Sequence, residues 1–150
     1  MVVQLGRAEP RHLSTVLELV RAFHEEEALA LEEEQRIKAV SMLLENDHYG
    51  HVFLIYAGDD LVGYLAVCFG FSIEFAGRDA SLDELYVIPE ARGLGTGREA
   101  LVRLSETMRD SGIAALHLEV EKSNDRARGL YRDLGFTPRD HYGLMSMPLL

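Results

Sequence analysis

Residues 81–98, with the sequence SLDELYVIPEARGLGTGR, decide the fold of this chain. Residues 82–88 are rich in apolar, aromatic and β-branched side chains, which favour a buried strand. Pro89 has no N–H to give to a sheet and ends that strand. A turn with three glycines follows, and a helical pattern begins at about Arg98. The free N–H groups of such a turn and the helix dipole face the same side, so the segment predicts a site for a phosphate group.

The composition describes an acidic globular chain. It has 150 residues, of which 47% are hydrophobic, and a formal net charge of −10. This length suits a single domain over residues 1–150 that buries roughly two thirds of its unfolded surface. The acidic balance argues against a nucleic-acid partner. No apolar run approaches the ~20 residues that span a bilayer, and the N-terminus lacks the apolar core of a signal peptide. We therefore expect a cytoplasmic protein without a membrane partner.

Cysteine and histidine give no metal pattern. Cys68 is the only cysteine and lies in an apolar run, so we expect a buried, inert thiol. His48 and His51 are close in sequence but have no clear third ligand beside them. We expect no metal site.

Hydrophobic patterns predict a mixed α/β order of elements around the opening segment. The predicted strands span residues 2–8, 51–57, 61–71, 82–88, 113–120 and 142–147. The predicted helices span residues 10–24, 33–44, 98–111 and 126–134. A hairpin turn at 58–60 makes the second and third strands antiparallel, and residues 72–80 form a longer connection. The helix between strands 82–88 and 113–120 makes those two strands parallel.

An acidic stretch follows the first predicted helix. His24 and Glu25 begin it, and the carboxylates extend to Glu27. It is either a solvated surface or a rim that attracts a cationic substrate. Glu74 and Phe75, in the 72–80 connection, are further candidates for substrate contact, although the favoured interpretation is that they only shape the loop.

Two common phosphate-binding loops fit the glycine turn poorly. A dinucleotide fold needs Gly-x-Gly-x-x-Gly near the N-terminus, whereas the spacing here is Gly93-x-Gly95-x-Gly97 after antiparallel strands. A nucleoside triphosphate loop ends in Gly-Lys-Ser/Thr, which Gly97-Arg98-Glu99 does not supply.

The chain resembles the Gcn5-related N-acetyltransferases in two segments. VIPEARGLGTGREAL (87–101) is similar to their pyrophosphate-binding motif, Arg/Gln-x-x-Gly-x-Gly/Ala, with Arg92, Gly95 and Gly97 in its places. LEVEKSNDRARGLYRDLGF (118–136) is similar to their second motif, with Asn124, Tyr131, Gly135 and Phe136 matching. FHEEE (23–27) and FGFSIEFAGRDA (69–80) look like bacterial members that are often labelled histone-acetyltransferase-like.

The resemblance implies a fold and a donor. The fold is a mostly antiparallel central sheet with one parallel pair splayed at the cofactor site, flanked by about four helices. The donor is acetyl-coenzyme A. Its pyrophosphate would lie on the backbone of the glycine turn, and its pantetheine arm would pair with main-chain atoms of the preceding strand. The implied cofactor residues are Leu85, Tyr86, Val87, Arg92, Gly93, Leu94, Gly95, Thr96, Gly97, Arg98, Asn124 and Tyr131.

The resemblance also implies the catalytic groups. Tyr131 corresponds to a general acid that protonates the departing thiolate. Asn124 would contact the pantetheine, and it would also serve as a plain helix N-cap. A protonated amine must lose its proton before it attacks, and the polyamine acetyltransferases have a carboxylate base at the position of Asp83. Glu84 matches a second acidic position, so the base is either of the two, with Asp83 preferred.

The acceptor is the least determined feature of the sequence. A small, cationic primary amine fits the acidic rim, whereas a protein lysine or N-terminus is the alternative acceptor. A non-catalytic module that senses acetyl-coenzyme A is an alternative of another class. Frequent dimers in the family make a homodimer the expected assembly.

Overall fold

The computed structural model describes residues 2–150, and the chain divides between Glu119 and Val120 into two compact units. The first unit contains a five-stranded sheet and three α-helices, and the second contains one α-helix. A single domain over residues 1–150 stays a prediction. None of the helices within residues 2–150 is long and apolar enough to cross a membrane.

The sheet follows the chain order β1-β2-β3-β4-β5. Each strand is antiparallel to the one before it, except that β5 runs parallel to β4. The mixed α/β fold and the parallel pair are therefore confirmed. The strands are β1 (Val3–Arg7), β2 (Gly50–Ala57), β3 (Asp60–Ser72), β4 (Gly77–Val87) and β5 (Ala115–His117).

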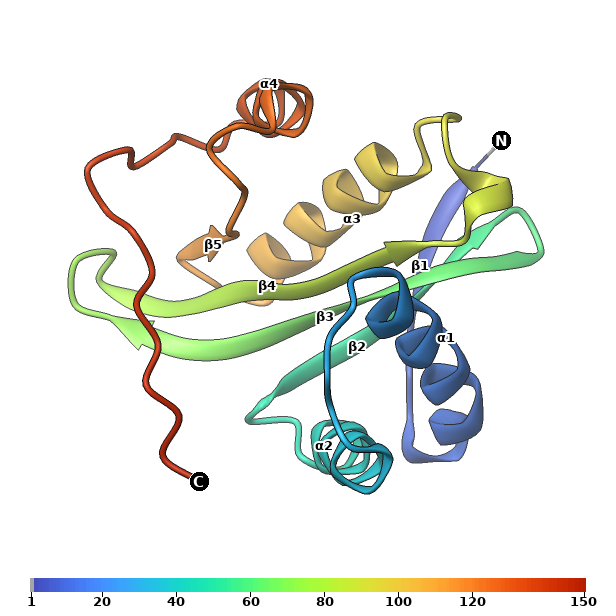
Figure 1. Cartoon of the computed structure of the whole chain (residues 1–150). Helices are drawn as coiled ribbons and strands as arrows, with labels where there is room; N and C mark the ends of the chain where they lie inside the picture. The colour runs from blue at the N-terminus through green and yellow to red at the C-terminus, as the bar shows by residue number, and fades with distance from the viewer. Residues whose placement is uncertain (1) are drawn as a thin grey trace. The chain divides into compact units, whose positions relative to one another are not determined.

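Helices of the first unit cover both faces of the sheet (Figure 1). The helices α1 (Leu13–Glu26) and α2 (Glu33–Glu45) lie on one face, and α3 (Thr96–Asp110) lies on the other. Short 3-10 turns at Pro10–His12 and Pro89–Ala91 precede α1 and α3. Apolar side chains of α1 at helical spacing, Val16 and Val20, pack against Tyr64 and Tyr86 of the sheet. This packing fixes α1 over the middle of β3 and β4, where the candidate site lies.

The second unit is built on α4 (Asp125–Asp133). The Asn124 side chain accepts a hydrogen bond from the N–H of Ala127 at 3.1 Å, which confirms its N-cap role. Gly135 follows the helix with φ of 104°, as expected for a glycine that ends a helix. The strand predicted at 142–147 is wrong, because this segment makes no ladder within the described residues. Alternating apolar residues indicate a strand only where a neighbouring strand accepts its hydrogen bonds.

Two further boundaries differ from the prediction. The connection predicted at 72–80 is a tight hairpin, because β4 already begins at Gly77 and pairs with the last residues of β3. Its turn contains Ala76 in the left-handed conformation, with φ of 57°. In contrast, β5 is much shorter than the predicted strand 113–120, because it pairs with β4 only from Asp79 to Ser81.

His51 of β2 is an imperfectly satisfied group in the first unit. Its Nδ1 atom is buried and has no hydrogen-bond partner within residues 2–150. The ring instead meets Phe69 edge to face, with 4.9 Å between the ring centroids. Burial, and then the charge of Arg7, lower the pKa of His51. Below pH ~6.5 the unfolded chain therefore binds a proton here that the folded chain does not, and stability falls as the pH falls.

Replacing this imidazole is expected to stabilise the protein. His51→Phe keeps the edge-to-face contact and removes the unpaired nitrogen, so the free energy of unfolding should rise by about 1 kcal/mol at pH 7. The gain should increase toward pH 5, because the variant has no proton to bind at this position. Urea unfolding at pH 7 and pH 5 measures both effects. The exposed His48, changed to Phe, is the control; equal pH dependence of wild type and His51→Phe would contradict the prediction.

Candidate active site

The centre of the candidate site is a β-bulge in β4 at Asp83. On one side of it Leu82 pairs with Val67, and on the other Glu84 pairs with Ala66, so Asp83 has no partner in β3. An extra residue of this kind bends the strand and changes which face the following side chains occupy. Without the bulge, Leu82 and Glu84 would lie on the same face. With it, Leu82 shares the face of Val67, whereas Glu84 lies with Tyr86 on the face that α1 covers.

Beyond the bulge, one edge of β4 has no partner strand within residues 2–150. The N–H of Ile88 donates to the carbonyl of Val62 at 2.8 Å, so the backbone N–H and C=O of Ile88 face β3. The backbone N–H and C=O groups of successive residues face opposite edges of an antiparallel strand. Those of Tyr86 therefore also face β3, whereas those of Leu85 and Val87 face the open edge. The predicted main-chain contacts to a pantetheine arm therefore narrow to Leu85 and Val87.

Arg92 lies at the end of this open edge. Its Nε donates to the carbonyl of Val87 at 2.8 Å, and a terminal nitrogen donates to Glu26 at 2.7 Å. The guanidinium also lies over the ring of Tyr86, 5.6 Å from its centroid. The side chain thus connects the end of α1 to the end of β4, which leaves the backbone of the following turn as the candidate anion site.

The glycine turn presents free N–H groups at the start of α3. Gly93 and Gly95 have φ of 80° and 79°, a conformation that favours glycine. The Thr96 hydroxyl is buried and donates to the carbonyl of Ala91 at 3.2 Å, which holds the turn against the helix. No acceptor within residues 2–150 contacts the N–H groups of residues 94–98. This turn, with a helix N-terminus behind it, suits a pyrophosphate.

Neither the backbone conformation nor the packing at position 97 requires a glycine. A Cβ at this position would meet no atom within 4 Å. Alanine is the better helix former, so Gly97→Ala is expected to raise the free energy of unfolding by up to ~1 kcal/mol. If a pyrophosphate lies on this turn, the same methyl group should weaken binding of coenzyme A about tenfold. Calorimetric titration with coenzyme A and urea unfolding measure the two effects; unchanged affinity would exclude the turn as the anion site.

Glu84 is held by two side chains on the α1 face. One carboxylate oxygen lies 2.6 Å from Nε2 of His24, and the other accepts a hydrogen bond from the Tyr64 hydroxyl at 2.9 Å. The other ring nitrogen of His24 accepts from Nε of Arg36 at 3.1 Å. Sequence reasoning missed Arg36 and Tyr64. An arginine in line with Val40 and Leu44 on the apolar stripe of a helix was a usable signal for the first, whereas a tyrosine in an apolar strand gave none for the second.

Asp83 differs from its neighbour in its surroundings. No hydrogen-bond donor within residues 2–150 contacts its carboxylate, and the residue keeps an exposed surface. Partial desolvation, followed by the charges of Glu84 and Glu119, raises the pKa of Asp83. A free carboxylate with a raised pKa is suited to accept a proton near neutral pH.

The four residues predicted to contact an acceptor do not come together. His24 is buried, with 7% of its surface exposed, beside Glu84. Glu25 lies exposed at the end of α1. Glu74 and Phe75 lie at the tip of the β3–β4 hairpin, about 20 Å along β4 from Glu84. Phe75 packs edge to face on His117, with the centroids 5.2 Å apart.

Tyr131 belongs to the second unit. Its ring lies edge to face with Phe136, with 6.0 Å between the centroids, and the N–H of Phe136 donates to the carbonyl of Tyr131. Burial raises the pKa of Tyr131, so its hydroxyl keeps a proton at neutral pH. A general acid needs that proton.

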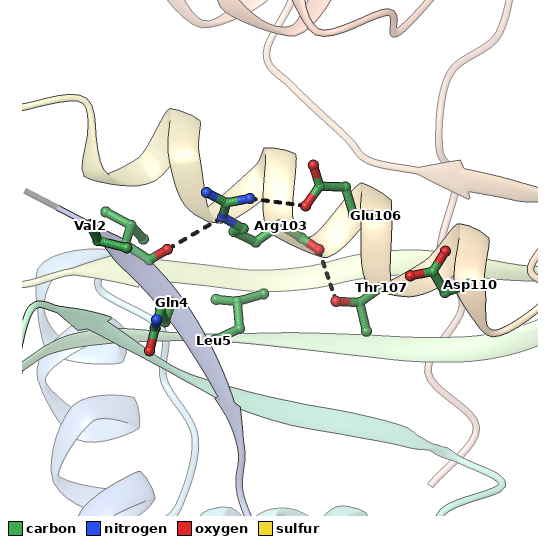
Figure 2. A pocket seen from close by; sticks show the side chains of 8 residues that line it. Val2, Gln4, Leu5, Arg103, Glu106, Thr107 and Asp110 are labelled. Atoms are coloured by element: carbon green, nitrogen blue, oxygen red, sulfur yellow. Dashed lines mark hydrogen bonds and ion pairs between the residues drawn. The ribbon is translucent and has the colours of Figure 1, made fainter.

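A groove of about 420 Å³ lies elsewhere, between β1 and α3 (Figure 2). Arg103 and Glu106 form an ion pair at 3.1 Å on its α3 wall, and the Thr107 hydroxyl donates to the carbonyl of Arg103. Three strand spacings, roughly 14 Å, separate β1 from β4 in the sheet. This groove is therefore distinct from the site around Asp83.

Comparisons with known proteins agree with this geometry. The sequence model of the acetyltransferase (GNAT) family matches residues 13–136. The chain is 29% identical over 146 residues to the thialysine N-epsilon-acetyltransferase of Bos taurus, covering 89% of this chain and 83% of that protein. It is 43% identical over 63 residues to the mycothiol acetyltransferase of Beutenbergia cavernae, covering 40% of this chain and only 21% of that protein. An integron cassette protein from the mobile metagenome of Cole Harbour salt marsh has a similar structure, with a TM-score of 0.83 and 30% identity over 98% of this chain and 91% of that one.

Proposed function

Because this chain belongs to the GNAT family of acetyltransferases, we propose that it transfers an acetyl group from acetyl-coenzyme A to the primary amine of a small, cationic acceptor. The observation that carries the proposal is the bulge at Asp83. It places a free carboxylate, whose pKa is raised, beside the open edge of β4.

The donor side of the proposal rests on the glycine turn and on β4. The free N–H groups of 94–98 would hold the pyrophosphate, and the main-chain groups of Leu85, with the N–H of Val87, would hold the pantetheine arm. The carbonyl of Val87 already accepts a hydrogen bond from Arg92. Acetyl-coenzyme A, when bound, supplies a thioester whose carbonyl carbon is open to a neutral amine.

The proton transfers are assigned to two residues. Asp83 accepts a proton from the acceptor's ammonium group, directly or through a water, because only the neutral amine is a nucleophile. Tyr131 gives a proton to the departing sulfur. Asn124 caps the helix that carries Tyr131.

The proposed acceptor is a small molecule with a positive charge. The exposed carboxylates of Asp83 on β4 and of Glu25 at the end of α1 carry negative charge on this part of the first unit. Acidic side chains attract a cationic amine over a neutral one. The homologous thialysine N-epsilon-acetyltransferase, named for a small amine substrate, supports this class of acceptor. The homodimer and the cytoplasmic location expected from the sequence stay predictions.

A screen of acceptors tests the proposal. The protein is incubated with acetyl-coenzyme A and thialysine, lysine, a polyamine, an aminoglycoside or peptides with a free N-terminus, and released coenzyme A thiol is measured. Turnover of a small cationic amine well above the peptides is the expected result. Turnover of peptides alone would favour a protein acetyltransferase. Tight binding of acetyl-coenzyme A without turnover of any amine would favour a sensor.

A further inference from the structure

A chain of hydrogen bonds runs from α2 to the sheet beneath the candidate base. It joins Arg36, His24, Glu84 and Tyr64, which lie on α2, α1, β4 and β3. Three of the four are buried: Arg36 is 9% exposed, His24 7% and Tyr64 0%. Buried polar groups are retained where each finds a hydrogen-bond partner, and each of these four side chains has one.

Arg36 fixes the tautomer of His24. A guanidinium has only N–H donors, so Nδ1 of His24 must present its lone pair to Arg36. The ring proton is then on Nε2, and it points at the Glu84 carboxylate 2.6 Å away. Glu33 holds the guanidinium in place through a contact of 2.5 Å to the opposite side of Arg36. Arg36 therefore determines that His24 donates its hydrogen bond to Glu84.

Tyr64 completes the arrangement on the other oxygen of Glu84. Burial, followed by the nearby charge of Glu84, raises the pKa of Tyr64, so its hydroxyl stays protonated and donates. Phe23 packs edge to face on the Tyr64 ring, with the centroids 6.3 Å apart, and limits its movement. Both oxygens of Glu84 thus accept hydrogen bonds, which hold the carboxylate in one orientation.

We propose that Arg36, His24 and Tyr64 are positioning residues that hold Glu84 as a fixed carboxylate beside Asp83, so that Asp83 alone serves as the base. The inference rests on the proposed function and deepens it. It assigns His24 to Glu84 rather than to the acceptor, because both ring nitrogens are already engaged inside the protein. It also distinguishes the two adjacent carboxylates, since donors engage both oxygens of Glu84, whereas the carboxylate of Asp83 is free to exchange the proton.

The tautomer of His24 is the direct test. In ¹⁵N-labelled protein at pH 8, long-range ¹H–¹⁵N spectra should show His24 as the neutral Nε2–H form. Arg36→Leu should populate the Nδ1–H form and lower kcat about tenfold, with the affinity for acetyl-coenzyme A unchanged within twofold. Arg21→Leu is the matched control, because Arg21 also pairs with Glu33, at 2.5 Å, but does not contact His24. In Arg21→Leu, the tautomer of His24 and the kcat of the enzyme should equal those of the wild type.

Tyr64→Phe tests the hydrogen bond to the other oxygen of Glu84. Because it removes a single hydroxyl, this variant still tests the inference if Arg36→Leu does not fold. It should lower kcat severalfold without changing the His24 tautomer. An Nδ1–H form in the wild type, or wild-type kcat in both variants, would overturn the inference. The spectra do not depend on turnover. A protein that acetylates no amine yet shows the tautomer change in Arg36→Leu would therefore refute the proposed function and support the assigned hydrogen bonds.

Discussion

Asp83→Asn is expected to lower kcat for amine acetylation by about 10²–10⁴-fold, the usual contribution of a general base. The amide has the same shape as the carboxylate but cannot take the proton of the acceptor. Affinity for coenzyme A, measured by calorimetric titration, should stay within twofold, because the proposed cofactor contacts lie on the other side of the bulge. Asp79→Asn is the control: Asp79 is another carboxylate of β4, but it is paired with His117 at 3.0 Å.

The dependence of kcat/KM on pH is a second test of Asp83 as the base. Burial, followed by the charges of Glu84 and Glu119, raises the pKa of Asp83. The carboxylate accepts a proton from the amine only when it is ionised, so kcat/KM should fall as the pH drops through this raised pKa. The acid limb should lie above pH ~4, the ordinary value for aspartate, and should disappear in Asp83→Asn. Wild-type kcat in the variant, or an unchanged acid limb, would exclude Asp83 as the base.

Tyr131→Phe is expected to lower kcat about 10²-fold or more and to leave affinity for acetyl-coenzyme A nearly unchanged. The hydroxyl keeps its proton at neutral pH, because burial raises the pKa of Tyr131. Phenylalanine preserves the packing against Phe136 and removes only the proton donor. Stopped assays of thiol release, together with titration of the cofactor, separate the two quantities.

The control for Tyr131 is a second tyrosine of the same unit. Tyr142 is 67% exposed, so Tyr142→Phe should behave as the wild type. A Tyr131→Phe variant with full kcat would remove Tyr131 from the acid role. A loss of affinity equal to the loss of kcat/KM would instead indicate that the hydroxyl only binds the cofactor.

Local sequence signals predicted most of the first unit. Apolar periodicity identified α1 and α2, and Gly112, with φ of 80°, marks the end of α3 as expected. The failures share one cause, which is dependence on a partner strand. β5 stops where β4 no longer pairs with it, and residues 142–147 have an alternating pattern without a ladder. Such pairing depends on residues far away in the sequence, which no local window contains.

The candidate site was predictable where a motif carries it, and less so elsewhere. The glycine turn follows from local spacing, because its function lies in the backbone. The bulge at Asp83 leaves no mark in the letters, since it is a mismatch between β3 and β4. The partnership of Arg36 with His24 joins two helices, and only the fold brings those side chains together.

The unpaired residue of β4 also bears on how an enzyme of this kind diversifies. Residues 84–87 keep their register with β3 on one side of Asp83, and residues 77–82 keep theirs on the other. A change of register in residues 77–82 can therefore be taken up at the unpaired residue, without shifting the strand segment proposed for the donor. Selection can act on the two halves of one strand separately. A single inserted residue thus makes the register of the segment proposed for the donor independent of the hairpin that precedes it.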